Sequence, residues 1–295
     1  MTILNQLPVV SMLGVPFTDY LNVTVPFDIG AEVSDKLLPV IESIGPMSEV
    51  DHGVYRLFDE RLKPTGAVFK FKKRGKVHVI SASGMALAAL RSTGNYSNYL
   101  RELSFFPHRV SMLHATQDYF VLDPSAVILS VKDAAFSEQL YLTRKVLKKA
   151  HVNALLSPGM AGTETGTVYL GNRANADVWA KVYDKQQERL QRAGFDPGPV
   201  VRVEIAVQSD VGATLRDAYD PHDLYFHFAS KSLVEAPQGF QGWVPSGEGF
   251  VLGESREVLP LDRLDRLLDF SLDLTRLVEI AVSAYGEKSG DVLSR

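Results

Sequence analysis

Alternating apolar and polar residues divide much of the chain into short β-strands. In the segment 19–25, Leu21, Val23 and Val25 alternate with polar residues, which is the period of a half-buried strand. The same period predicts strands at 55–58, 68–72, 77–81, 109–120, 167–173, 177–185 and 200–207. Glycines between the early strands mark tight turns, which indicates an antiparallel meander.

Apolar residues three and four positions apart predict helices between these strands. The predicted helices cover 34–44, 84–90, 96–103, 133–150 and 261–285, and 186–193 is predicted as a short polar helix. The helix at 133–150 would end in basic residues, which suit the negative end of a helix dipole. The last helix is the most regular, with Asp262 near its start and Gly286 just after its end. Segments rich in glycine, proline and serine predict loops at 157–166 and 237–253.

This order of elements predicts an α+β protein in which antiparallel sheets carry helices on one face. The main domain would cover 1–255 and would consist of two pseudo-repeated halves, at about 15–105 and 106–235. The strand at Asp19 and the strand at His114 would be equivalent members of these halves. Residues 256–295 would form a C-terminal amphipathic helix that packs on this domain.

Composition excludes several classes of protein. The chain has 295 residues, of which 45% are hydrophobic and 22% charged, as in soluble globular proteins. It has no cysteine, which excludes disulfides, thiolate zinc sites, iron–sulfur clusters and cysteine nucleophiles. A net charge of −4 argues against coating nucleic acid by bulk charge, so any DNA contact needs a local patch. The sequence shows neither a long apolar run nor a signal peptide, which predicts a cytoplasmic protein without a membrane partner.

Common catalytic motifs are also absent. The sequence has no phosphate-binding loop of the Gly-x-x-x-x-Gly-Lys type and no Gly-x-Gly-x-x-Gly motif. It has no His-Glu-x-x-His, no Gly-x-Ser-x-Gly and no His-apolar-His pair of the kind found in many DNA-nicking enzymes. Candidate chemistry must therefore come from side chains that different strands bring together.

Three predicted strands carry chemically active pairs at spacings of two or four, which place both members of a pair on one face. The pairs are His114 with Asp118, Tyr183 with Lys185, and Arg202 with Glu204. Carboxylate and imidazole groups bind Mg²⁺ or Mn²⁺, and such an ion polarises a phosphodiester. A tyrosine hydroxyl can then attack phosphorus. A nearby lysine would bind a phosphate oxygen or ease the loss of the phenol proton.

The same region contains a series of motifs with a recognisable order. The motifs are Thr167-Val-Tyr-Leu-Gly-Asn-Arg173, Ala180-Lys-Val-Tyr-Asp-Lys185 and Val201-Arg-Val-Glu-Ile205. This series resembles the signature of the replication initiation factor family, the rolling-circle initiators of filamentous phages, integrative elements and Gram-positive plasmids. The segments 109–118 and 18–25 and the end of the last helix, Ala284-Tyr-Gly286, resemble the family more weakly.

The resemblance implies a metal-dependent enzyme that nicks one DNA strand at an origin. Such a protein stays joined to the 5′ phosphate through tyrosine and leaves a 3′ hydroxyl for the host polymerase. The resemblance implies Mg²⁺ or Mn²⁺ as cofactor, origin DNA, host helicase and host polymerase as partners, and a homodimer as one possible state. Carried over by position, the roles are Tyr183 as nucleophile with Lys185 beside it, Asp118, Glu204 and His114 as metal ligands, and Lys185, Arg202 and Arg173 as phosphate contacts.

Three positions depart from the family pattern. Met112 and His114 stand where the family has arginine and aspartate, and Asn172 stands where it has serine. These departures leave two alternatives, a functional variant or a decayed site. The chain would in the second case be a catalytically inactive DNA- or protein-binding regulator of a phage or mobile element on the same scaffold. A weaker alternative is a host-directed phage protein that binds no DNA.

Each candidate also has a purely structural interpretation. Tyr183 could be an ordinary strand tyrosine, with Tyr169 or Tyr219 as the nucleophile instead. His114 could be a core histidine. Asp118 and Glu204 could form plain ion pairs with Arg202 or a lysine. Trp179 and Trp243 are most simply residues of the core or its rim.

The densest basic run lies on a predicted hairpin and consists of Lys70, Lys72, Lys73, Arg74 and Lys76. The run is either a solvated hairpin tip or a hairpin that follows DNA phosphates. Because Phe69 and Phe71 alternate with the lysines, they share the opposite face, and we expect both rings to pack in the core.

Overall fold

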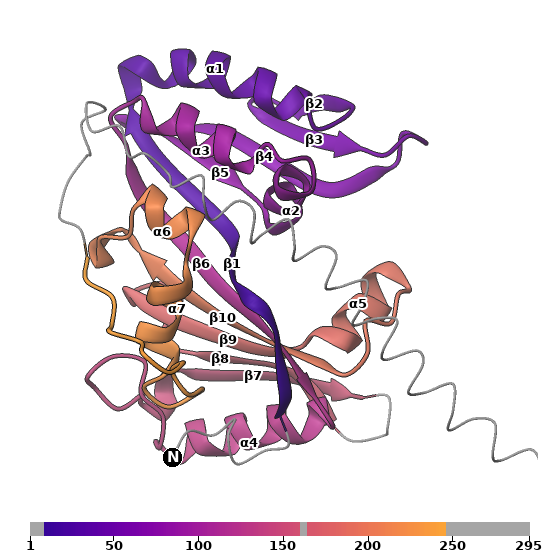
Figure 1. The fold of residues 1–295 in the computed structure, drawn as a ribbon, viewed down its shortest axis with the longest axis vertical. Coiled ribbons are helices and arrows are strands. Elements are labelled where there is room, and N and C mark those ends of the chain that lie inside the picture. Colours follow the sequence, from indigo (N-terminus) through magenta and orange to yellow (C-terminus); the bar gives the residue numbers. More distant parts are fainter. Residues whose placement is uncertain (1–8, 160–163, 246–295) are drawn as a thin grey trace, which may run out of the picture. The chain divides into compact units, whose positions relative to one another are not determined.

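Ten strands form one antiparallel sheet in the order β2-β3-β4-β5-β1-β6-β10-β9-β8-β7 (Figure 1). The computed structural model describes residues 9–159 and 164–245, all within one compact unit, Met1–Glu257. The strands are β1 (Val9–Pro26), β2 (Met47–Asp51), β3 (Val54–Phe58), β4 (Pro64–Arg74), β5 (Val77–Ala82), β6 (Arg109–Val121), β7 (Val152–Pro158), β8 (Glu164–Leu170), β9 (Val178–Asp184) and β10 (Val200–Gln208). The helices are α1 (Gly30–Glu42), α2 (Gly84–Ser92), α3 (Tyr96–Ser104), α4 (Pro124–Phe136), α5 (Lys185–Ala193), α6 (Leu215–Tyr219) and α7 (His222–Ala229). None of these helices combines the length and the apolar character that crossing a membrane requires.

The sheet consists of two halves with the same strand order. β1 is followed by α1 and by β2 to β5, and β6 is followed by α4 and by β7 to β10. In each half the last strand returns beside the first, since β5 pairs with β1 and β10 pairs with β6. The two first strands pair with each other in the middle of the sheet. The predicted α+β class is confirmed, with one continuous sheet in place of several, and the strands at Asp19 and His114 hold equivalent places. The domain boundaries stay a prediction.

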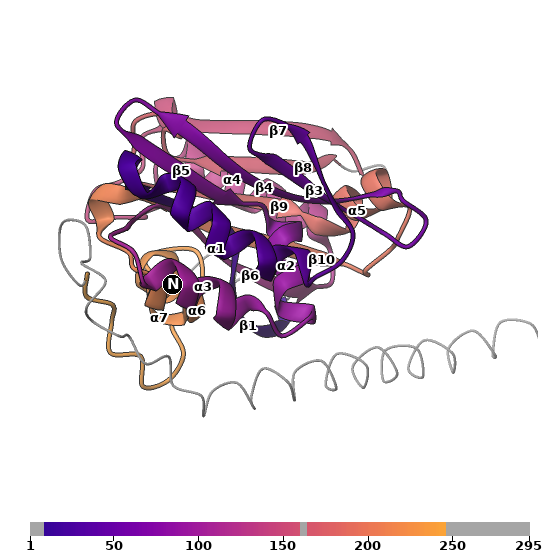
Figure 2. The same ribbon diagram turned by 90° about the horizontal axis from the view of Figure 1, so that it is seen from above.

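One face of the sheet is apolar because every second strand residue is aliphatic. Leu21, Val23, Val182, Val203 and Ile205 on this face are at most 1% exposed. Against it, α2 packs on β1 and β4, α4 packs on β8 and β9, and α6 and α7 pack on β1 and β6. Figure 2 shows α1, α2, α3, α6 and α7 on the same side of the sheet. Burial of these side chains is the main source of the stability of the sheet.

The second face carries the intervening residues, which are mostly polar or aromatic. Its middle part carries Tyr20, His114, Glu204 and Tyr183, and the half made of β2 to β5 carries Lys70 on this face. In the described part of the chain the helices α1 to α4, α6 and α7 lie on the opposite side. We call this second face the open face.

The predicted helix at 133–150 is wrong. The helix here is α4, which begins earlier, with Asp123 as its N-cap and Pro124 in its first turn. It ends at Phe136, and Glu138 then adopts a φ of 55°, which a helix cannot continue through. The following segment is irregular. Its leucines are buried individually, and their spacing resembles that of a helix only by coincidence. The lysines of this segment therefore do not lie at a helix C-terminus, and the helix-dipole interpretation of them is wrong as well.

Four elements have no counterpart among the predicted ones. They are β2, β7, α6 and α7. β2 and β7 are the two edge strands, which bury few side chains and therefore show a weak apolar period. α6 is a single turn with a capping box made by Thr214 and Asp217, a sequence signal that could have found it. The predicted helix at 261–285 lies outside the described residues.

Candidate functional site

Residues of five neighbouring strands form three rows across the middle of the open face, and each row spans four of these strands. Each row consists of residues that the strands pair directly, so that their side chains lie on the same side. The first row is Tyr20, His114, Ala206 and Trp179; the second is Thr116, Glu204, Lys181 and Tyr169; the third is Asp118, Arg202, Tyr183 and Thr167. Successive rows are two residues, or about 7 Å, apart along the strands. The structure thus brings the candidates from β6, β9 and β10 onto one surface.

Arg202 of the third row is buried between two carboxylates. Its Nε and Nη2 donate to the two oxygens of Asp118 at 2.5 and 2.8 Å, and its Nη1 donates to Asp19 Oδ2 at 3.1 Å. This bidentate geometry is the strongest form of ion pair. Both oxygens of Asp118 are therefore taken up by a cation of the protein, which matches the plain ion-pair interpretation of this residue.

Asp19 is the member of this cluster that the sequence did not predict. In a regular strand Asp19 would lie on the side of Leu21, but the pairing of β1 with β6 shifts between Thr18 and Tyr20. Such a bulge inserts one residue and turns it toward the other face. Burial raises the pKa of Asp19, and Arg202 opposes that rise. An acidic residue in a β-branched strand is a weak signal, and the bulge itself has none in the sequence.

Tyr183 lies beside Arg202 and is only 4% exposed. Its hydroxyl is 3.4 Å from Lys185 Nζ, and Lys181 Nζ lies 3.7 Å from the centre of its ring. Burial, with a further contribution from Glu204, raises the pKa of Tyr183, so the phenol is protonated at neutral pH. The hydroxyl therefore needs a proton acceptor before it can act as a nucleophile.

The position of Lys185 is fixed by the first turn of α5. Asp184 ends β9 and caps α5, since its carboxylate accepts from the backbone N–H of Gln187. Lys185 is therefore the first helical residue, and its Nζ lies between Tyr183 and Glu188, 2.5 Å from Glu188 Oε2. Burial, and next the charge of Arg202, lower the pKa of Lys185. A lysine with a lowered pKa is a suitable proton acceptor.

The predicted metal ligands do not fit a metal ion as they lie. Glu204 is paired with Lys181, whose Nζ lies 3.4 Å from Oε1, and Asp118 is paired with Arg202. Across residues 9–159 and 164–245, no group of three or more histidine, aspartate or glutamate side chains could hold a metal. A Mg²⁺ or Mn²⁺ ion would need oxygen ligands that these ion pairs already use.

His114 lies between two aromatic rings on the open face. Its ring centre is 5.0 Å from that of Tyr20 and 5.2 Å from that of Trp179. Its Nε2 is buried without a hydrogen-bond partner. Burial lowers the pKa of His114 from 6.5 to about 4, so the imidazole is neutral at pH 7.

The protein should therefore lose stability in mild acid through His114. The unfolded chain binds the proton with a pKa of 6.5 and the folded chain only near 4, so the contribution is complete above pH 6.5 and is lost as the pH falls toward 4. The loss is about 3 kcal/mol over this range. Urea unfolding at pH 7 and pH 4.5 should show a smaller acid loss for His114→Phe than for the wild type, and equal losses would contradict this assignment.

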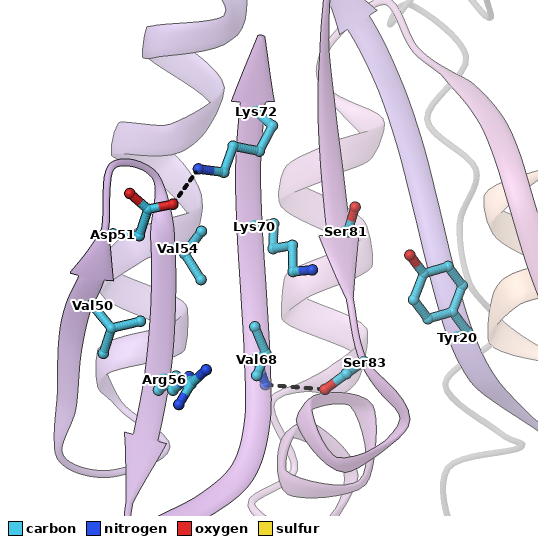
Figure 3. Close-up of a pocket in the computed structure, with 10 residues that line it drawn as sticks. All are labelled: Tyr20, Val50, Asp51, Val54, Arg56, Val68, Lys70, Lys72, Ser81 and Ser83. Carbon is cyan, nitrogen blue, oxygen red and sulfur yellow. Dashed lines mark hydrogen bonds and ion pairs between the residues drawn. The ribbon is translucent and has the colours of Figure 1, made fainter. Parts of the chain in front are cut away.

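The basic hairpin divides between the two faces of the sheet. Lys70 and Lys72 lie on the open face of β4, in a groove of about 650 Å³ that also contains Arg56 (Figure 3). Lys72 Nζ is already paired with Asp51 at 2.9 Å. Lys73 lies on the other side, with its Nζ 4.1 Å from the centre of the Phe27 ring.

The cations at the tip of the hairpin are exposed, whereas the two phenylalanine rings of β4 are buried. Arg74 and Lys76 are exposed next to the turn between β4 and β5. Phe69 and Phe71 are buried on the helix-covered face, which confirms their expected packing role. The run therefore offers two lysines to the open face and two cations at its end.

The remaining candidates fall into two places. Tyr169 and Arg173 lie at the open face, with the Arg173 guanidinium carbon 4.8 Å from the centre of the Tyr169 ring. Tyr219 lies on α6, where its ring stacks on Tyr96 on the helix-covered side, remote from Tyr183. Trp243 donates from its Nε1 to Asp217.

The departures from the family pattern have local explanations. Met112 pairs with Asn22 and Gln208, one row beyond His114. Asn172 accepts from the backbone N–H of Ala174 and so shapes the turn after β8. Neither side chain contributes to the row that contains Tyr183.

Comparison with known proteins gives a similarity of fold. No protein-family model matches the chain, and no curated protein matches its sequence. The structure is similar to that of the rolling circle replication initiator protein from Geobacillus stearothermophilus, with a TM-score of 0.46 and 11% identity over 86% of this chain and 96% of that chain.

Proposed function

We propose that this protein is a rolling-circle replication initiator that binds origin DNA on the open face and cuts one strand with Tyr183. The observation that carries the proposal is the third row, where the Tyr183 hydroxyl lies 3.4 Å from Lys185 Nζ and its neighbour in register is Arg202. A nucleophile, a proton acceptor and a fixed cation are the parts that phosphodiester cleavage requires.

The open face supplies a local surface for DNA in an acidic protein. Lys70, Arg56 and Lys181 lie on it, and Arg173 is exposed beside it, although the chain has a net charge of −4. Cations of this kind bind phosphates and release counterions, while rings between them stack on bases. The opposite face is covered by helices and has no such role.

The cutting step balances with water as the source of one proton. The Tyr183 oxygen attacks phosphorus, an O–P bond forms, and the bond from phosphorus to the 3′ oxygen breaks. The phenol proton passes to neutral Lys185, and the departing 3′ oxygen takes a proton from water. Because burial disfavours both phenolate and ammonium, proton transfer accompanies O–P bond formation and does not precede it. The product is a 5′-phosphotyrosine and a free 3′ hydroxyl.

Charge on the phosphate is balanced in this proposal by cations of the chain. Lys181 lies over the Tyr183 ring, 3.7 Å from its centre. No step is assigned to Mg²⁺ or Mn²⁺, because the predicted ligands are engaged in ion pairs. Calorimetric titration of the full chain with Mn²⁺ tests the metal prediction. Binding by the wild type that is lost in Glu204→Gln would support Mg²⁺ or Mn²⁺ as a cofactor.

Lys185 should control the pH dependence of cutting. Only neutral Lys185 accepts the phenol proton, so the rate should rise with pH and level off above the pKa of Lys185, which burial holds below 10.5. Single-turnover cutting across pH 6–10 should show this rise in the wild type, and a slow, flat profile in Lys185→Met. A Lys185→Met profile that still rises like the wild type would exclude Lys185 as the acceptor.

A second candidate function is a DNA-binding regulator that does not cut. Two observations favour it: Tyr183 is 4% exposed, and Asp118 is bound to Arg202 in place of a metal. Both fit a scaffold that has kept its surface for DNA and lost its chemistry. In either case the protein would act in the cytoplasm, and only the cutting enzyme would hand a 3′ end to host helicase and polymerase.

A nicking assay separates the two candidates. Supercoiled plasmid with the cognate origin is incubated with the full chain in the presence of Mg²⁺ or Mn²⁺. The proposal predicts open circular DNA with protein covalently attached to its 5′ end. Gel-shift binding without nicking would favour the regulator, and absence of binding would contradict both candidates and leave the host-directed protein.

A further inference from the structure

Flat side chains form a continuous row across the open face. The ring centres of Tyr20 and His114 are 5.0 Å apart, and those of His114 and Trp179 are 5.2 Å apart. The guanidinium carbon of Arg173 lies 5.2 Å from the Trp179 ring and 4.8 Å from the Tyr169 ring. These five side chains thus extend from β1 to β8, and three of them belong to the first row described above. In this subsection, 'the row' means these five side chains.

A small residue makes this contact possible. β10 lies between β6 and β9, so His114 and Trp179 are separated by the position of Ala206. Because Ala206 has only a methyl group, the two rings meet above it. Two strands with one strand between them are about 10 Å apart. A larger side chain at position 206 would fill the space above β10 and keep the two rings apart.

Two polar atoms in the row lack partners. Trp179 Nε1 and His114 Nε2 are both buried without a hydrogen bond, and Trp179 is 4% exposed. A buried polar group without a partner is destabilising, so the row is less stable here than a fully hydrogen-bonded surface would be.

Arg173 covers this part of the row but is itself exposed. Its guanidinium rests on two aromatic faces, a contact worth only about 0.5–1 kcal/mol at an exposed site. A planar ligand can therefore take its place, and the freed guanidinium can bind a phosphate.

We propose that an unpaired base of single-stranded DNA stacks against Trp179 and Tyr169 in the place of the Arg173 guanidinium, while Arg173 turns to a neighbouring phosphate. The geometry favours a single strand because the base faces of a duplex are stacked on each other and closed to side chains. Only the choice of DNA as the nucleic acid rests on the proposed function.

Tryptophan fluorescence tests this site directly, because the chain has two tryptophans. In the full chain with Trp243→Phe and Tyr183→Phe, all tryptophan emission comes from Trp179 and no cutting by Tyr183 interferes. A thymidine oligonucleotide of about 12 nucleotides should quench this emission, and the duplex of the same length should not. Binding seen by anisotropy of a labelled oligonucleotide without a change in Trp179 emission would overturn the proposal.

A second pair of variants guards against an indirect signal. Tyr169→Ala should weaken binding of the oligonucleotide about 5- to 150-fold, the effect of losing one base–aromatic stack, and Tyr169→Phe should restore it. Tyr141→Ala is the matched control, since Tyr141 is 39% exposed in the segment after α4 and outside the row. Equal affinities of Tyr169→Ala and Tyr141→Ala would also overturn the proposal.

The outcome is distinguishable from failure of the proposed function. Quenching of Trp179 in a protein that never nicks an origin plasmid would remove the cutting chemistry and leave the base site. Nicking without quenching would do the reverse. No binding of either strand form would contradict the base site.

Discussion

Replacing Tyr183 with phenylalanine is expected to abolish strand cutting while the sheet stays folded. The variant loses the only atom that forms the bond to phosphorus, so the cutting rate should fall about a thousand-fold or more. The ring remains to fill the space between Lys181 and Arg202. The measurement is conversion of supercoiled to open circular plasmid, together with the loss of covalent protein–DNA adduct on a denaturing gel.

Stability and a matched tyrosine provide the controls for this variant. Loss of the hydrogen bond from Lys185 should cost about 1 kcal/mol, so urea unfolding should remain cooperative and close to that of the wild type. Tyr169→Phe, in the neighbouring row, should keep its cutting activity. An adduct that persists in Tyr183→Phe and disappears in Tyr169→Phe would transfer the role of nucleophile to Tyr169.

Replacing Arg202 with methionine should destabilise the fold strongly, because it removes the cation at the centre of a buried cluster. The guanidinium separates the carboxylates of Asp19 and Asp118, and its removal leaves both without their cation. Breaking a buried ion pair on one side typically costs about 3–5 kcal/mol. Equilibrium urea unfolding at pH 7 measures this loss.

A surface arginine and a change of pH test the cause of that loss. Arg192→Met removes an ion pair with Glu188 whose arginine side chain is 78% exposed, and it should cost less than about 1 kcal/mol. Burial already raises the pKa of Asp19, and loss of Arg202 raises it further, so the deficit should shrink as the pH falls and Asp19 takes up a proton. A deficit that is equally large at pH 5 would point to lost packing instead.

The strand patterns predicted which side chains share a face, because alternation decides this within each strand. Arg202 and Glu204 had to lie on one side of β10, and His114 and Asp118 on one side of β6. Alternation says nothing about which strand lies beside which. Only the sheet order puts β10 between β6 and β9 and so gives Asp118 an arginine partner where a metal was predicted.

The helices show a similar limit. α2 and α3 follow their apolar spacing, and α5 lies between the cap Asp184 and Gly194, so the positions of all three could be predicted to within two residues. The segment 133–150 could not, because Leu140, Leu142 and Leu147 are buried from an irregular backbone that happens to repeat helical spacing. The start signal at Asp123 and Pro124 was the better guide, since a cap bonds locally whatever follows.

The site of covalent attachment tests the central claim most directly. The full chain is reacted with a single-stranded oligonucleotide that contains the origin, digested with trypsin and nuclease, and analysed by mass spectrometry. The account predicts a nucleotide attached through Tyr183 in the peptide Val182–Lys185. DNA that is cut with the nucleotide attached to another tyrosine, or to none, would contradict it.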